Sequence, residues 1–294
     1  MTMVAVDWGT SSLRGALVES DGRVLEERAF ARGILTVEKN GFLEVFESCF
    51  GNWMTPGRLC LISGMAGSKQ GWRETPYCAC PAGFGDIAAR LTWVDPGRIA
   101  IVPGLSIEHG AIPDVMRGEE TQIFGTLALL GLTNARLVLP GTHSKWVTVE
   151  NQRVTDFSTW MTGEFYALLR QHSILSRTLP AGDPVPDDHA FEQGVMRALR
   201  EGGLLHTAFS VRTLLLFDHM APNALCSYLS GLVIGEELRG QNLQPGDSVV
   251  ITGSDALTAR YAQALRLCGV TVVCVSSQAT WRGLKTIADT LGLS

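Results

Sequence analysis

Hydrophobic runs and turn signals alternate at the start of the chain in a way typical of β-strands. Residues 3–6 are apolar, residues 13–18 are mostly apolar, and the pair Asp21-Gly22 separates this second run from residues 24–27. An Asp-Gly pair between two strand-like runs favours a tight hairpin. The beginning of the chain therefore predicts three consecutive antiparallel strands.

The rest of the first half alternates helices with strands. Apolar residues at helical spacing predict a helix near 41–54, and short apolar runs predict buried strands at 58–63 and 99–102. Residues 119–130 again place apolar side chains on one face of a helix. This alternation predicts an α/β fold.

The order of elements at the start of the chain recurs in the second half. Three short strands follow one another and a helix comes after them, at 136–139, 145–149, 154–158 and 161–172. The recurrence predicts a structural duplication whose halves share almost no readable sequence identity. We expect a first domain over residues 1–117 and a second over 118–278.

Helical patterns dominate the remainder of the second half, apart from a polar, proline-rich loop at 180–188. The helix over 161–172 is expected to have an inner face of Met161, Phe165, Leu168 and Leu169. Strands at 248–252 and 270–275 flank a helix at 256–267. A terminal helix at 279–292, free to pack back on the first domain, carries Trp281, Leu284, Ile287 and Leu291 on one face.

Length, composition and charge narrow the class of protein. The chain has 294 residues, of which 46% are hydrophobic and 18% charged, the balance of a folded globular protein long enough for two domains. Its 24 Lys and Arg against 29 Asp and Glu give a net charge of −5. No diffuse basic surface is expected to attract nucleic acid or a membrane, so any anion must be bound locally.

The cysteines and the first residues indicate the compartment. Seven cysteines, several inside apolar runs, are typical of reduced, buried thiols. The close pair Cys78 and Cys80 lacks the spacing and the second ligand pair of a zinc site. The first residues have no basic region and reach Asp7 after a short apolar run, so we expect no signal peptide, no membrane span and a cytoplasmic location.

The first of three candidate anion-binding turns follows the first predicted strand. Asp7 at the strand end could hold Mg²⁺ or its waters, while Gly9, Thr10 and Ser11 offer backbone N–H and hydroxyl donors to phosphate oxygens. A hairpin turn in which Asp7 caps its own backbone is the alternative interpretation.

A second turn occupies the matching position in the second half. It begins at Pro140, and its candidate phosphate contacts are Gly141, Thr142, His143 and Lys145. A solvated strand position is an equally open interpretation of Lys145. Two such turns in matching positions are harder to obtain by chance than one.

The third turn, Gly253-Ser254-Asp255, lies between a buried strand and the start of a helix. Backbone donors and the helix dipole favour ribose or phosphate oxygens at such a position. A plain helix N-cap formed by Ser254 or Asp255 is the alternative.

The order of these turns resembles the phosphate-1, phosphate-2 and adenosine motifs of the sugar kinase, heat-shock chaperone and actin superfamily. More closely, the stretches AVDWGTSSLRGAL, SGMAGSKQGW, VMRGEETQIFG, LPGTHSKWV, LSGLVIG and TGSDALTARY resemble the 2-dehydro-3-deoxygalactonokinase family over nearly the whole chain. The resemblance implies two ribonuclease H-like, actin-like ATPase domains with ATP in the cleft between them. It also implies Mg²⁺ and phosphorylation of the 6-hydroxyl of 2-dehydro-3-deoxy-D-galactonate in galactonate catabolism.

Phosphoryl transfer of this kind needs a metal-neutralised triphosphate, an in-line hydroxyl and a carboxylate that accepts the hydroxyl proton. The resemblance to carbohydrate kinases places an acid at the helix start in Gly118–Gly125, where Glu119 is the first choice of base and Glu120 the reserve. Complementing the helix macrodipole is the alternative role of both acids. Asp156 and Glu164 are further acidic candidates.

The implied acceptor is itself an anion, so we expect a cation or backbone donors for its carboxylate. The candidates are Arg14, Gly67, Ser68, Lys69 and Arg117. Trp8 or Trp72 could pack against the carbon chain of the acceptor, and ordinary core packing is at least as good an interpretation of both.

The expected partners are ATP and a small sugar acid, with no nucleic acid and no membrane; a homodimer is left open. A kinase for another small sugar or sugar acid on the same fold is the main alternative, because nucleotide motifs do not report the acceptor. A non-catalytic sugar or nucleotide sensor is the other. Such a sensor usually carries a DNA-binding helix-turn-helix ahead of the core, and the position of Asp7 counts against one here.

Overall fold

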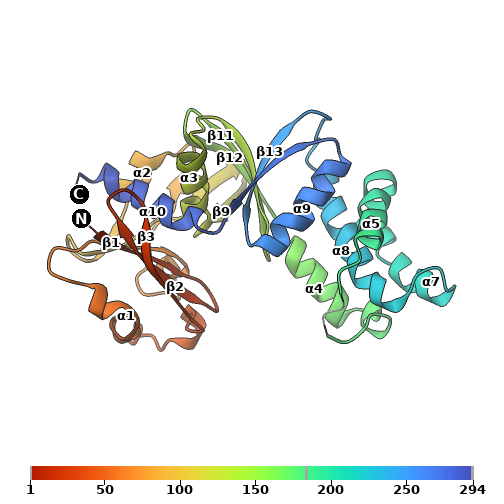
Figure 1. Ribbon diagram of the computed structural model, residues 1–294, viewed down its shortest axis with the longest axis horizontal. Helices are drawn as coiled ribbons and strands as arrows, with labels where there is room; N and C mark the ends of the chain where they lie inside the picture. The colour runs from red at the N-terminus through yellow and green to blue at the C-terminus, as the bar shows by residue number, and fades with distance from the viewer. Residues whose placement is uncertain (1, 183–184, 293–294) are drawn as a thin grey trace. The chain divides into compact units, whose positions relative to one another are not determined.

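The computed structural model describes residues 2–182 and 185–292 (Figure 1). Its Cα packing divides the chain into two compact units. Unit 1 comprises Met1–Leu137, Val147–Ser158 and Val275–Ser294, and unit 2 comprises Val138–Trp146 and Thr159–Cys274. Among the helices of the described residues, none is both long and apolar enough to cross a bilayer.

A six-stranded sheet forms the centre of unit 1, with the strand order β3-β2-β1-β4-β7-β6. Its strands are β1 (Thr2–Trp8), β2 (Leu13–Glu19), β3 (Val24–Phe30), β4 (Cys60–Gly64), β6 (Thr92–Asp95) and β7 (Ile99–Ile101). The predicted antiparallel run β1 to β3 is confirmed, and β4 pairs in parallel with both β1 and β7. Gly22 takes a φ of +88° in the β2-β3 hairpin, which explains the Asp-Gly signal.

Successive residues of β1 point to opposite faces of this sheet, and both sets are buried because helices cover both faces. On one face Val4, Val6 and Trp8 pack with Phe46 and Phe50 of α1 (Phe42–Phe50). On the other, α10 (Ala279–Thr290) packs on β1, β2 and β4, and α3 (Glu119–Leu130) packs on α10. The terminal helix thus lies on strands from the first 117 residues; the domain boundary at 117/118 stays a prediction.

A three-stranded sheet in unit 1 was not predicted. It has the order β5-β8-β9 and consists of β5 (Cys78–Ala79), β8 (Leu105–His109) and β9 (Ile112–Met116). These strands are short and largely exposed, so they carry no clear apolar alternation. The short elements α2 (Phe84–Ala88), η1 (Ile34–Thr36), η2 (Gly51–Trp53) and η3 (Met65–Gly67) complete this part of the chain.

A five-stranded sheet has the order β12-β11-β10-β13-β14. Its strands are β10 (Ala135–Leu139), β11 (Ser144–Glu150), β12 (Arg153–Trp160), β13 (Ser248–Gly253) and β14 (Thr271–Ser276). Numbered from its own first strand, this order is 3-2-1-4-5, which is also the order of β3-β2-β1-β4-β7 in the other sheet. The recurrence seen in the sequence is therefore present in the topology.

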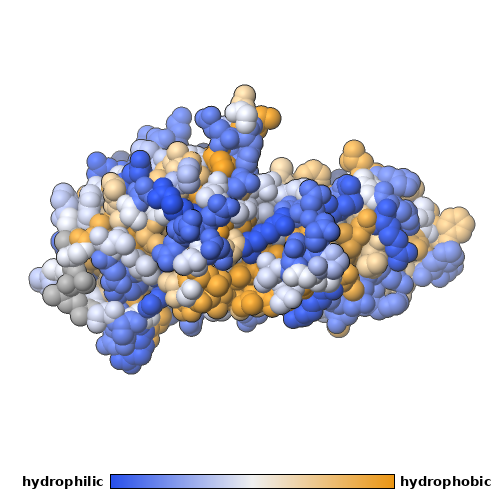
Figure 2. Space-filling view, turned by 90° about the horizontal axis from the view of Figure 1, so that it is seen from above, coloured by the Kyte–Doolittle hydropathy of each residue, from blue (hydrophilic) through white to orange (hydrophobic). Residues whose placement is uncertain are grey.

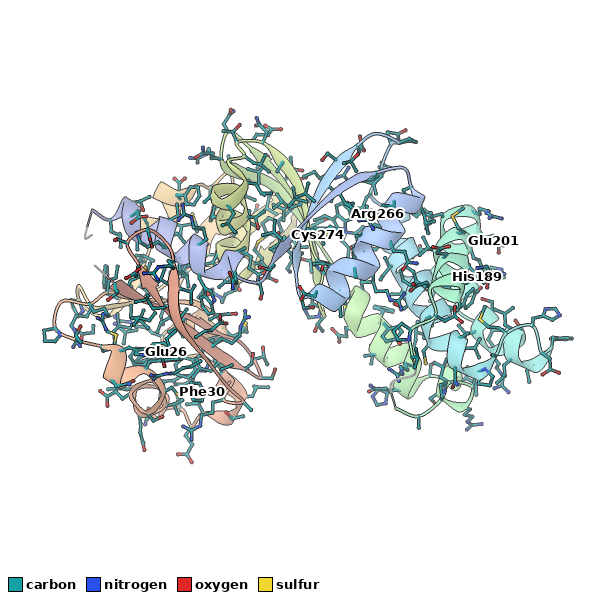
Figure 3. The ribbon with its side chains drawn as sticks, viewed as in Figure 1. Glu26, Phe30, His189, Glu201, Arg266 and Cys274 are labelled. Carbon is teal, nitrogen blue, oxygen red and sulfur yellow. The ribbon has the colours of Figure 1, made fainter. Side chains whose placement is uncertain are left out.

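Unit 2 adds a helical layer. Its helices are α4 (Thr162–His172), η4 (Ile174–Arg177), α5 (Asp188–Glu201), α6 (Leu204–Thr207), α7 (Ser210–Leu216), α8 (Pro222–Arg239) and α9 (Asp255–Leu267). Figure 3 labels His189 and Glu201 near the two ends of α5, which packs closely along α8. Phe191 of α5, Ile234 of α8 and Tyr261 of α9 belong to one buried cluster with the sheet residue Val249.

The predicted inner face of α4 is wrong for three of its four residues and confirmed for Leu169. Met161, Phe165 and Leu168 are 45%, 41% and 43% exposed, whereas Tyr166 and Leu169 pack against the helical core. Helical spacing shows that apolar residues share a face but not which way that face points. Figure 2 shows hydrophobic residues at the surface between hydrophilic ones, as expected for a fold in which such exposure is common.

Candidate functional site

The turn after β1 is fixed by backbone hydrogen bonds and followed by a paired carboxylate and guanidinium. Gly9 N–H donates to Ser12 O at 2.9 Å, and Ile34 N–H donates to Gly9 O at 3.0 Å, while Thr10 and Ser11 are exposed. These contacts leave the tip of the turn at the surface of unit 1, where the side chains of Thr10 and Ser11 face solvent.

Asp7 lies next to the end of β1 and opposite Arg14 of β2. Arg14 Nη2 donates to Asp7 Oδ2 at 2.7 Å. Within the described part of the chain, Arg14 is the side-chain partner of Asp7, so the alternative in which Asp7 caps its own turn is wrong. The structure thus joins the residue predicted to hold the metal to one predicted to bind the acceptor.

Two glycines bring the ends of β1 and β4 close to the start of α3. Gly64 has a φ of +86°, and a Cβ there would lie 2.8 Å from Trp8 O and 3.2 Å from Asp7 Oδ1. Gly118 has a φ of +107°, and its Cβ would lie 3.3 Å from Gly64 Cα. Both positions need backbone that glycine adopts readily, so the first turn of α3 can lie beside the strand end that carries Asp7.

The two acids that begin α3 differ in their surroundings. Glu120 is fully buried and accepts from Gly118 N–H at 2.6 Å through Oε2, while its Oε1 has no hydrogen-bond partner among the described residues. Burial raises the pKa of Glu120 to about 8, and the neighbouring charge of Glu119 adds to the rise. Glu119 is partly exposed, and its Oε2 accepts from Arg117 N–H at 3.0 Å.

Only part of the Arg117 guanidinium is hydrogen-bonded within the described chain. Its Nη2 donates to Thr75 O at 2.7 Å, and the group stacks over Tyr77 at 4.3 Å from the ring centroid. Its Nε and Nη1 are buried without a hydrogen-bond partner in the described chain, and so is Ser68 Oγ. A Cβ on Gly67 would lie 2.6 Å from Arg117 Nη1, so this guanidinium is adjacent to the 67–68 loop.

The turn after β10 is attached to the start of α4. Glu164 N–H donates to Thr142 O at 3.0 Å, and the His143 ring lies 2.6 Å from Glu164 Oε2 through Nε2. Gly163 is needed for this contact, because a Cβ there would lie 2.5 Å from Gly141 O. Thr142 and His143 are exposed, so their side chains face solvent as those of Thr10 and Ser11 do.

Lys145 lies in β11 directly behind this turn. It is 5% exposed, and its Nζ donates to Thr159 Oγ1 on β12 at 2.7 Å. The alternative of a solvated strand residue is therefore wrong. A buried ammonium close to this candidate anion-binding turn keeps its electrostatic influence, because little water screens it.

The turn after β13 lies beside the turn after β10. A Cβ on Gly253 would lie 3.7 Å from Pro140 Cδ and 3.8 Å from Pro140 O. Ser254 occupies the N-cap position of α9, yet its side chain makes no capping hydrogen bond. Side-chain capping by Ser254, the alternative interpretation, is thus not what the structure shows.

The remaining candidates are either exposed or part of the core. Asp156 is exposed and 3.5 Å from His109 Nε2, and Lys69 is exposed. Trp8 is fully buried, donates to Arg32 O at 2.9 Å and packs against Trp72, so both tryptophans belong to the core of unit 1.

Sequence reasoning missed Glu237 of α8. This carboxylate is 1% exposed and accepts hydrogen bonds from Trp146 Nε1 at 2.7 Å, from Tyr261 OH at 2.7 Å and from Thr162 Oγ1. The sequence signal was the second of two acids that follow the apolar stretch LSGLVIG, where burial demands polar partners.

Comparison with known proteins identifies the family of the chain that carries these candidate residues. The family described as 2-keto-3-deoxy-galactonokinase matches residues 7–287, which include all three turns and both acids of α3. The chain belongs to the 2-keto-3-deoxy-galactonokinase family. Its α/β fold and its resemblance to carbohydrate kinases are thereby confirmed.

Relatives in the 2-keto-3-deoxy-galactonokinase family match the chain nearly end to end. A protein of Rhizobium meliloti described as a probable 2-dehydro-3-deoxygalactonokinase is 41% identical, covering 97% of this chain and 95% of its own. The 2-dehydro-3-deoxygalactonokinase of Escherichia coli K12 is 34% identical, covering 97% of both chains.

Solved structures agree on the fold. A crystal structure from Sinorhizobium meliloti whose description names the same enzyme has a TM-score of 0.91 at 38% identity, covering 98% of this chain and 99% of its own. An activator of 2-hydroxyisocaproyl-CoA dehydratase from Clostridium difficile, solved with ADPNP, has a TM-score of 0.54 at 12% identity, covering 100% and 96%. The latter likeness concerns the fold alone.

Proposed function

We propose that this protein is an ATP-dependent kinase that phosphorylates the 6-hydroxyl of 2-dehydro-3-deoxy-D-galactonate, in the cytoplasm, as a step of galactonate catabolism. The observation that carries the proposal is the family match over residues 7–287, together with the enzyme name shared by both relatives. Its partners are ATP and the sugar acid. The net charge of −5 supports no role in binding nucleic acid or membranes.

The nucleotide contacts come from the three turns. We assign the triphosphate to the turns after β1 and β10 and the adenosine to the turn after β13, with the contact residues Gly9, Thr10, Ser11, Gly141, Thr142, His143, Lys145, Gly253 and Ser254. Exposed small residues and backbone donors at such turns suit phosphate oxygens. Support comes from the exposed tips of both phosphate turns and from the buried ammonium of Lys145.

Asp7 is the proposed Mg²⁺ residue. The described residues contain no cluster of three or more His, Cys, Asp or Glu suited to a metal ion. A single carboxylate still fits Mg²⁺, which commonly takes one or two protein carboxylates and fills its shell with water and substrate phosphates. Bound there, the ion neutralises charge on the triphosphate, and Arg14 holds the carboxylate in place at 2.7 Å.

Arg117 is the proposed anchor for the carboxylate of the acceptor. Its buried Nε and Nη1 and the buried Ser68 Oγ have no hydrogen-bond partner in the described chain, and Gly67 lies against the guanidinium. Buried donors of this kind cost stability unless a partner satisfies them, and a substrate carboxylate supplies charge-assisted hydrogen bonds. Arg14 is a second cation for the acceptor.

Glu119 is the proposed base. As the bond between the acceptor oxygen and the γ-phosphorus forms and the bond to the β-phosphate oxygen breaks, Glu119 takes the hydroxyl proton and ADP leaves. Burial raises the pKa of Glu120 to about 8, so most of this carboxyl group already carries a proton at pH 7 and only a minor fraction is able to accept one. Glu120 is therefore the reserve candidate.

An acceptor panel tests the proposal. Purified protein is incubated with ATP, Mg²⁺ and individual sugar acids, and ADP release is followed with a coupled assay. We expect 2-dehydro-3-deoxy-D-galactonate to give the highest kcat/KM. A higher value for another sugar or sugar acid would identify a different acceptor, and nucleotide binding without phosphorylation of any acceptor would indicate a sensor.

A further inference from the structure

A buried hydrogen-bonded cluster lies behind the phosphate turn of unit 2. Glu237 of α8 accepts from Trp146 of β11 through Oε1, and from Tyr261 of α9 and Thr162 of α4 through Oε2. One carboxylate thus joins a strand and three helices of unit 2; α4, α8 and α9 are labelled in Figure 1.

The cluster is connected to the turn Pro140–His143 through two neighbouring segments, the start of β11 and the start of α4. Ser144, the first residue after the turn, lies with Oγ 2.8 Å from Tyr261 OH and is buried. Since Tyr261 OH donates to Glu237, the Ser144 hydroxyl donates to Tyr261. On the other side, Thr162 begins α4, whose Glu164 N–H donates to Thr142 O at 3.0 Å.

Burial of this carboxylate is costly, and its partners offset the cost. Burial raises the pKa of Glu237, and the hydrogen bonds from Thr162, Tyr261 and Trp146 counteract the rise. Replacing a buried ion pair or polar network with apolar residues of similar volume often leaves the protein equally stable. A satisfied polar network instead fixes one geometry for the elements that it joins.

We propose that Glu237 is a positioning residue that sets the geometry of the phosphate turn Pro140–His143 for ATP. It acts on the start of β11 through Tyr261 and Ser144, and on the start of α4 through Thr162. The proposal rests on the proposed use of this turn for nucleotide. It assigns no contact between Glu237 and the substrate, because the carboxylate is enclosed by protein groups.

Two buried tyrosines of unit 2 provide a matched test. Tyr261 and Tyr228 are 2% and 3% exposed, and each hydroxyl lies 2.8 Å from a serine Oγ, that of Ser144 or Ser210. Only Tyr261 of the two is hydrogen-bonded to Glu237 among the described contacts. Tyr261→Phe and Tyr228→Phe therefore each remove a buried hydroxyl, but only the former breaks into the Glu237 cluster.

We expect Tyr261→Phe to raise the Kd for MgATP, measured by direct titration, about fivefold. The effect is smaller than that of losing a direct contact, because the hydrogen bond removed supports the turn and does not touch the nucleotide. The KM for the acceptor stays unchanged. Tyr228→Phe keeps the wild-type Kd while losing a comparable amount of thermal stability. Equal MgATP affinity in the two variants would overturn the positioning role.

Replacing Glu237 itself distinguishes hydrogen-bond geometry from bulk. In Glu237→Gln the oxygen still accepts from Trp146, and the amide N–H₂ donates to the two hydroxyls, which reverse direction, so most of the MgATP affinity is retained. Glu237→Met removes the acceptor of all three hydrogen bonds and weakens MgATP binding at least as much as Tyr261→Phe. Equal losses of MgATP affinity in Glu237→Gln and Glu237→Met would contradict the proposal.

Wild-type protein that binds MgATP without phosphorylating any acceptor would overturn the kinase proposal alone.

Discussion

Two buried carboxylates, Glu120 in unit 1 and Glu237 in unit 2, show how differently the two candidate binding regions are built. Both lie in helices and both have a raised pKa because of burial. Glu237 accepts from three side chains, whereas Glu120 Oε1 has no partner in the described chain. The unit 2 turn therefore rests on a satisfied network, which favours one geometry.

The start of α3 in unit 1 has polar atoms left to satisfy. Besides Glu120 Oε1, these are Nε and Nη1 of Arg117 and the hydroxyl of Ser68. Unpaired buried donors discriminate strongly between ligands, because a ligand lacking the matching acceptor leaves the cost unpaid. The unit 1 group is therefore suited to selecting an acceptor, and the unit 2 turn to holding a nucleotide in one geometry.

The largest expected effect comes from Glu119. Glu119→Gln should lower kcat by about 10²–10⁴-fold, the usual contribution of a general base, with the Kd for MgATP unchanged. Steady-state kinetics and nucleotide titration measure both. Glu120→Gln is the matched control and should keep most of the activity, since Glu120 is already mostly neutral at pH 7. The reverse pattern would transfer the role of base to Glu120.

Arg117→Ala should raise the KM for the sugar acid by roughly 10–100-fold, because a charge-assisted hydrogen bond contributes about 1.5–3 kcal/mol. The KM for ATP should stay constant. Lys69→Ala, which removes an exposed cation from the same loop region, should change neither KM. An unchanged acceptor KM in Arg117→Ala would remove the anion site from unit 1.

Asp7→Asn should raise the Mg²⁺ concentration that gives half-maximal activity by about tenfold, because the variant loses its carboxylate charge. The measurement is activity against free Mg²⁺ at saturating ATP. An ordinary metal dependence in this variant would assign the ion to other groups. Arg14→Gln serves as the control for the ion pair, since it frees Asp7 from Arg14 without removing the carboxylate.

The smallest effect on activity is expected for Glu120, whose replacement changes how stability depends on pH. The folded pKa of Glu120 is about 8, against 4.5 for an ordinary Glu. The native state thus holds this proton more tightly, so its contribution is fully present below pH 4.5 and is lost as pH rises through 8. Glu120→Gln should flatten the fall of Tm between pH 5 and pH 9, an effect of a few kcal/mol at roughly 1.4 kcal/mol per pKa unit. Parallel Tm profiles for variant and wild type would contradict the burial argument.

Much of the fold could be predicted because its signals are local. The helix over 119–130 was predicted with the bounds that the structure gives, since acids begin it and Gly131 ends it with a φ of +64°. The orientation of α4 could not be predicted in the same way. Which side of a helix is buried depends on the elements around it, and the apolar stripe through Phe165 is exposed.

The candidate site also combines local features, which the sequence predicted, with long-range contacts, which it did not. Each turn was visible in a few consecutive residues, but the pairing of Asp7 with Arg14 depends on strand register across a hairpin. Glu237 is 91 residues from Trp146 and 75 from Thr162, so no local pattern could join them. Sequence therefore located the binding turns and missed the network that supports one of them.

The contrast between the two regions is tested most directly by measuring Arg117→Ala and Tyr261→Phe side by side, with both KM values determined for each variant. We expect the two effects to separate: Arg117→Ala raises the KM for 2-dehydro-3-deoxy-D-galactonate alone, and Tyr261→Phe raises the KM for ATP alone. If both variants weaken the same substrate, or if each leaves both KM values unchanged, the assignment of acceptor selection to unit 1 and nucleotide positioning to unit 2 is contradicted.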